Sequence, residues 1–122
     1  MARHFKELIA WQQADLLRQA IWAAVRRTPG MDPKFRTQWT DAARSVCSNT
    51  AEGFGRRSHR EFARFLELAS SSLREIEDLI HEARMRGYMT EEGASELERQ
   101  VRRTSAPLAR LLRYLRNNPD RP

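Results

Sequence analysis

Apolar residues recur every three or four positions along most of this 122-residue chain, which is the spacing of amphipathic helices. Turn-forming residues interrupt that spacing in three places, at 28–33, 53–57 and 87–91. Because short connections make sequential helices antiparallel, the four remaining segments predict an all-α, antiparallel up-down-up-down four-helix bundle. We expect one domain over residues 1–117, with its third and fourth helices longer than the second, and a short C-terminal tail over residues 118–122.

The break between the second and third helices combines glycines with a capping pattern. We expect the second helix to end near Gly53 and the chain to turn at Gly55, because residues without Cβ leave the right-handed region at little cost. Ser58 and Glu61 have the spacing of a capping box. In that motif the Ser58 hydroxyl accepts from the Glu61 N–H, and the Glu61 carboxylate accepts in turn from the Ser58 N–H.

The first predicted helix is apolar nearly all round. Its apolar residues point in three directions, along Ile9, Leu16 and Ala20, along Leu17, Ile21 and Val25, and along Leu8, Trp11 and Trp22. One bundle core cannot bury all three lines, and the chain is too short for this helix to be central in a larger protein. We therefore expect a homo-oligomer with Leu8, Trp11 and Trp22 as the leading interface residues. The alternative is a tryptophan that lies flat on the surface.

Charge adds a preference for acidic partners. The formal net charge is +6 and the sequence pI is near 10.6, which favours RNA, DNA or an anionic membrane surface. Only Lys6 and Lys34 are lysines among the 22 basic residues. Such arginine-rich usage also follows from the base composition of a genome, so the charge permits nucleic-acid binding without requiring it.

The fourth predicted helix carries the clearest charge pattern. Five arginines share an arc of roughly 100° in helical projection, opposite an apolar side: Arg99, Arg102, Arg103, Arg110 and Arg113. A solvated face must be polar, but exposed faces usually mix both signs. The row therefore predicts contact with an anionic partner, with Arg56 and Arg57 as further candidates for nucleic-acid binding. Pro107 lies within the row and is expected to kink the helix.

Polar side chains also border the apolar line of the second helix, at Gln38, Ser45, Asn49 and Glu52. In a structural reading, Asn49 and Glu52 hydrogen-bond backbone groups of the turn and hold it against a neighbouring helix. Arg56 then pairs with Glu52, or with Glu75 or Glu77 of the third helix. In a functional reading, Gln38, Asn49, Glu52 and Arg56 form a site for a small anion or ligand.

Enzyme signatures are few. Cys47 is the only cysteine, which excludes an intrachain disulfide and fits a reducing compartment. The histidines, His4, His59 and His81, lack the partners of a di-iron or zinc site, and no phosphate-cradling glycine loop or nucleophile motif occurs. We expect no catalysis, no cofactor and no metal. The start of the chain lacks the apolar run of a secretory signal, and no membrane-spanning run occurs, so we expect a cytoplasmic, soluble protein.

The chain resembles the four-helix-bundle proteins related to the 23S rRNA intervening-sequence protein, a family that is similar to the accessory variability protein of diversity-generating retroelements. The resemblance covers nearly the whole chain and rests on Gln38, Ala42, Ala43, Ser45, Asn49, Ala51-Glu52-Gly53, Gly55-Arg56, Ser58, Phe62, Phe65-Leu66, Ala69, Ser72-Leu73, Glu75, Glu77 and Gly87-Tyr88. It implies a ring-shaped homopentamer and a connection with RNA.

Together these observations predict a non-catalytic, oligomeric binding scaffold that contacts structured RNA or an RNA-handling protein through basic surfaces. Two alternatives remain open. The basic oligomer can engage an acidic protein, or the polar residues of the second helix can bind a small ligand.

Overall fold

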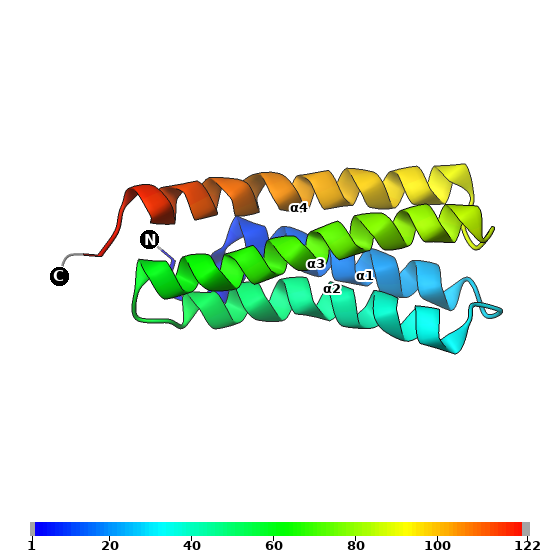
Figure 1. The fold of residues 1–122 in the computed structure, drawn as a ribbon, viewed down its shortest axis with the longest axis horizontal. Coiled ribbons are helices and arrows are strands. Elements are labelled where there is room, and N and C mark those ends of the chain that lie inside the picture. Colours follow the sequence, from blue (N-terminus) through cyan, green and yellow to red (C-terminus); the bar gives the residue numbers. More distant parts are fainter. Residues whose placement is uncertain (1, 121–122) are drawn as a thin grey trace.

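The computed structural model describes residues 2–120 as four long helices preceded by one short 3-10 turn (Figure 1). The elements are η1 (Phe5–Glu7), α1 (Ile9–Arg26), α2 (Pro33–Phe54), α3 (His59–Met85) and α4 (Glu91–Asn117). Successive long helices run antiparallel, and the first and last described residues lie at the same end as the α2–α3 turn. The predicted four-helix bundle is confirmed, including α3 and α4 of 27 residues each beside an α2 of 22.

Each helix contacts only its two neighbours, in the cyclic order α1, α2, α3, α4 and back to α1, among the described residues. The core between them is built around two aromatic rings of α2, Phe35 and Trp39, which are fully buried and meet edge to face. Because α1 is only 18 residues long, the last turns of α4 run past its start. There Leu115 packs with Ala63 and Leu66 of α3 as a second, smaller core.

Local sequence explains where the helices begin. Pro33 occupies the first turn of α2, where its missing N–H costs nothing. The Thr90 hydroxyl caps α4 by accepting from the Gly93 N–H at 3.1 Å. Pro107 is buried inside α4, and the helix continues through it as one element to Asn117.

The expectation that α2 ends near Gly53 is confirmed within one residue, but the backbone conformation expected of its glycines is wrong. The helix continues to Phe54, and neither Gly53 nor Gly55 has a positive φ. Gly53 serves packing instead, because a Cβ at this position would lie 2.9 Å from both Phe62 Cδ1 and Phe65 Cβ of α3. The glycine therefore brings α2 and α3 close together just before the turn.

Only half of the predicted capping box forms. The Ser58 hydroxyl accepts from the Glu61 N–H at 3.1 Å, as expected. The return hydrogen bond from the Glu61 carboxylate is not made, and Glu61 instead lines a shallow hollow with Arg56 and Arg64. The ordinary N-cap of Ser58 is sufficient to start α3.

Candidate nucleic-acid interface

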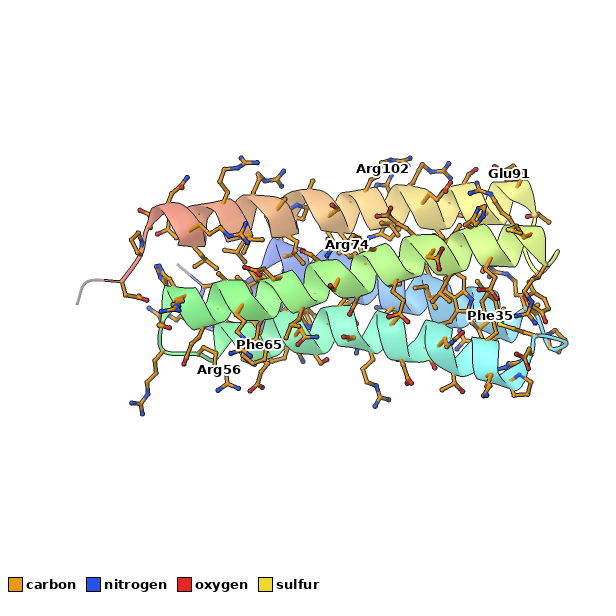
Figure 2. All side chains as sticks on the ribbon, viewed as in Figure 1. Phe35, Arg56, Phe65, Arg74, Glu91 and Arg102 are labelled. Atoms are coloured by element: carbon orange, nitrogen blue, oxygen red, sulfur yellow. The ribbon has the colours of Figure 1, made fainter. Side chains whose placement is uncertain are left out.

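The arginine row of α4 lies on the outside of the bundle. All five members, Arg99, Arg102, Arg103, Arg110 and Arg113, are exposed. Figure 2 shows Arg102 extending from α4 away from the other helices. Among residues 2–120, none of the five lies within ion-pair distance of a carboxylate. The row is therefore a strip of exposed positive charge without ion-pair partners along one helix.

Other arginines of the bundle are used differently. Within residues 2–120, five of them form ion pairs with carboxylates, namely Arg18, Arg56, Arg84, Arg86 and Arg116. Arg84 of α3 binds Glu91 and Glu98 of α4 together, with N–O distances of 2.7 Å to each. These hydrogen bonds lower the pKa of both carboxyls. Such pairs join or brace helices, a role that the α4 row does not share.

Arg56 and Arg57, the two further candidates, lie at the α2–α3 turn and not on the row. Arg56 pairs with Glu52 at 2.5 Å, the first of the partners expected for it, and lies 4.7 Å from the centre of the Phe65 ring. Figure 2 shows Arg56 and Phe65 together at the side of the bundle away from α4. Arg56 is thus neutralised and stacked, whereas Arg57 is exposed.

The polar residues of α2 face the groove between α2 and α3. Asn49 Nδ2 donates to both the backbone O and Oγ of Ser45 at 2.9 Å, within its own helix and not to the turn as expected. Ser72 Oγ of α3 donates to Ser45 Oγ at 2.7 Å and makes the link between the helices. Gln38 and Glu52 are exposed on either side. The hydrogen-bond donors of Asn49 are satisfied locally, which favours the structural reading of these residues.

Groups with catalytic potential are either buried or dispersed. Burial raises the pKa of the Cys47 thiol to about 11, so its nucleophilic thiolate is scarce at neutral pH. His59 Nδ1–H donates to the Asn118 carbonyl, and Asp120 accepts from the His59 backbone N–H, so both residues belong to contacts of the C-terminal segment. Within residues 2–120 no three His, Cys, Asp or Glu side chains gather in a way that can hold a metal ion. In the same part of the chain no helix is long and apolar enough to span a bilayer.

The three apolar lines of α1 have different surroundings. The line through Leu17 and Ile21 is fully buried in the core. Trp11 is partly covered because it packs on the core and meets Phe5 of η1 edge to face at 5.2 Å. Ile9 and Leu16 remain 60% and 49% exposed.

The residues first favoured for an interface are therefore not the most exposed ones. Leu8 is half-buried, and Trp22 is 39% exposed with the Arg18 guanidinium over its ring. The sequence gave no sign that η1 would cover Trp11, because a 3-10 turn of three residues is too short to leave a recognisable periodic pattern. The line through Ile9 and Leu16 was visible in the sequence, but its exposure depends on how α1 is rotated against α4.

Comparison with known protein families gives a match to the family described as 23S rRNA-intervening sequence protein, over residues 6–110. The matched segment includes all of α1, α2 and α3 and most of α4. No curated protein matches the chain.

Proposed function

The chain belongs to the 23S rRNA-intervening sequence protein family, and from this membership we propose that it is a non-catalytic, self-associating scaffold that binds structured RNA. The family name links the fold to ribosomal RNA. The α4 arginines supply the chemistry, because an exposed guanidinium recognises phosphate through paired N–H donors.

One observation carries this proposal. The α4 row is exposed and free of ion pairs within residues 2–120, although the same bundle pairs arginines with carboxylates elsewhere. A row of like charges destabilises a helix face unless an anion neutralises it. Arginines spread along an open helix face suit phosphate contacts, so we propose contact with the RNA backbone and shape.

The surroundings of the remaining reactive groups support a role without catalysis. Cys47 is buried, and the raised pKa of its thiol makes it a poor nucleophile at neutral pH. Asp78 and His81, the nearest approach to a ligand pair on α3, are both exposed. The polar groups of Ser45, Asn49 and Ser72 satisfy one another, which leaves little there to recognise a ligand.

Binding of a structured RNA hairpin, measured at about 50 and 200 mM salt, tests the proposal. Wild-type protein should bind at the lower salt and weaken steeply at the higher one. Reversal of three row residues, Arg102, Arg110 and Arg113, to glutamate should abolish binding. A matched control reverses three exposed arginines on other helices, Arg26, Arg44 and Arg74, and should retain most of the affinity despite the same net charge.

Two results would contradict RNA binding through this face. One is the absence of affinity at about 50 mM salt, a condition that favours phosphate contacts. The other is equal loss of binding in the row variant and its control, because net charge alone would then explain the affinity. An acidic protein that binds wild type but not the row variant, with no RNA affinity, would support the alternative partner.

Self-association is the second part of the proposal. The exposed Ile9 and Leu16 of α1 support it, because large apolar side chains at neighbouring positions favour burial against another subunit. A ring of five copies remains a prediction from the resemblance, and a cytoplasmic location remains a prediction from the sequence. Sedimentation equilibrium at several protein concentrations measures the number of chains in the assembly. A mass of one chain at every concentration would contradict self-association.

A further inference from the structure

Tyr114 is an exposed aromatic side chain in the last turns of α4. It is 53% exposed, and Trp22 is the only other Phe, Tyr or Trp residue within 2–120 that is exposed. The Arg18 guanidinium lies over the Trp22 ring, whereas within the same residues no arginine lies over the ring of Tyr114. An exposed ring of this kind can take a flat group against its face.

Tyr114 continues the arginine row of α4 at its C-terminal end. It follows Arg110 by one turn, about 6 Å along the helix axis, and lies about 40° from it in helical projection. Arg113 is its neighbour in sequence. Between residues 99 and 119 the chain contains six arginines and no acidic residue. The ring therefore ends a strip of positive charge that contains no carboxylate of its own.

The C-terminal segment holds the Tyr114 ring in place. His59 of α3 meets the ring with centroids 6.1 Å apart and planes inclined by 53°. His59 is held in turn, because its Nδ1–H donates to the Asn118 carbonyl at 2.6 Å and its backbone N–H donates to Asp120 at 2.5 Å. Asn118 Nδ2 also donates to the backbone carbonyl of Tyr114 at 2.9 Å. A side chain that is already oriented loses little conformational freedom when a ligand stacks on it.

We infer that Tyr114 is a stacking platform for an unpaired base of the bound RNA, next to a paired segment whose phosphates contact the arginine row. This inference rests on the RNA binding proposed above and adds the class of RNA, a helix with an unpaired nucleotide at its end or in a loop. Unpaired bases stack on aromatic side chains, and every base offers a face for such a contact. Bases inside a duplex stack on one another and cannot reach the ring.

The neighbouring arginines fit this arrangement. Arg110 and Arg113 lie beside Tyr114, where the phosphates on either side of a stacked base are expected. Tyr114 also lies beyond the segment that matches the family, residues 6–110. The stacking site therefore does not follow from family membership.

An RNA duplex with a short unpaired 3′ overhang tests the inference, compared with the same duplex whose overhang lacks its bases. Both RNAs carry the same phosphates, so the arginine row contributes equally to their binding. At about 50 mM salt, wild type should bind the base-bearing RNA about 5-fold or more tightly, the effect of one aromatic stack. A 2-aminopurine in the overhang should lose fluorescence on binding, because stacking quenches its emission.

Two substitutions of Tyr114 separate stacking from packing. Tyr114→Leu keeps an apolar side chain against His59 but removes the aromatic face, so it should abolish the preference for the base-bearing RNA. Its affinity for a blunt duplex should equal that of wild type. Tyr114→Phe should retain the preference, and Met85→Ala, which removes an exposed apolar side chain of α3, should behave as wild type. Because Tyr114 is about half exposed, circular dichroism should show folded helices in both Tyr114 variants.

Two results would overturn the inference while leaving RNA binding intact. One is equal affinity of wild type for the base-bearing and base-free overhangs, and the other is a base preference that persists in Tyr114→Leu. A different result, no affinity of wild type for any of these RNAs at about 50 mM salt, would remove the proposed function and the stacking site together.

Discussion

Gly53 of α2 packs so tightly against Phe65 of α3 that a Cβ on the glycine would lie 2.9 Å from the Cβ of Phe65. The neighbour is the root of a side chain, which cannot swing away, so α2 and α3 must separate to accept a methyl group. We expect Gly53→Ala to destabilise the protein by about 1–3 kcal/mol, the range for overpacked cores. Urea unfolding gives the difference directly.

Gly30→Ala is the matched control for that substitution. A Cβ at Gly30 meets nothing within 4 Å, and the residue has no positive φ. The free energy of unfolding of the Gly30→Ala variant should stay within about 0.5 kcal/mol of wild type or rise slightly, because alanine restricts the conformations of the unfolded chain. Equal stability of Gly53→Ala and wild type would show that α2 and α3 are not held at this distance by the glycine.

The ion pairs of Arg84 with Glu91 and Glu98 predict a contribution to stability that depends on pH. Hydrogen bonding to Arg84 lowers the pKa of Glu98 and Glu91 in the folded state from the ordinary value of 4.5. A carboxyl whose pKa is lowered by folding stabilises the protein at pH values above its ordinary pKa. This contribution is lost as the pH falls through the folded-state pKa. Arg84→Met should therefore lower the Tm at pH 7, and the difference from wild type should shrink toward pH 3.

Arg74→Met provides the comparison for the pH series, since Arg74 donates only to the Ser71 hydroxyl at 3.3 Å among the described residues. Its Tm difference from wild type should not change with pH. An Arg84→Met difference that is equally constant would mean that the ion pairs with Glu91 and Glu98 add nothing to stability in solution.

Cys47 should report on opening of the bundle. Burial raises the pKa of its thiol from 9.0 to about 11, and a two-unit increase reduces the thiolate fraction near pH 8 about 100-fold. Alkylation by iodoacetamide should accordingly be at least about 100-fold slower in the folded protein than in urea. Mass spectrometry measures both rates. A folded-state rate close to the unfolded one would place the thiol at the surface and contradict the buried position on α2.

Periodicity was sufficient to predict the bundle because it depends on neighbours in sequence. The same information predicted the cap at Ser58, which is a local hydrogen bond. It could not predict the role of Gly53, because a glycine beside a turn has the same sequence pattern whether it supplies a left-handed φ or a close helix contact. Only the position of Phe65, twelve residues later, distinguishes the two.

The candidate interface likewise has features that the sequence predicted and features that it did not. The arginine row of α4 was predictable, since the regular geometry of one helix determines the relative directions of its five arginines. The paired state of Arg56 was one of several open choices, and the structure selects Glu52 one turn away. The exposure of Leu16 rather than Trp11 depended on η1 and on the rotation of α1, neither of which a periodic pattern contains.

The salt dependence of RNA affinity should count the contacts made by individual arginines of the row. Each phosphate neutralised releases counterions, so removing one contact should reduce the slope of log K against log salt by about 1. Arg102→Gln and Arg113→Gln should each produce this change, and the double variant about twice as much if the two act independently. Neutral substitution avoids the repulsion that a carboxylate adds. Arg44→Gln and Arg74→Gln, which are exposed on α2 and α3, should leave the slope unchanged. If all four substitutions reduce it equally, RNA responds to the overall field of the protein and the α4 row is not its binding face.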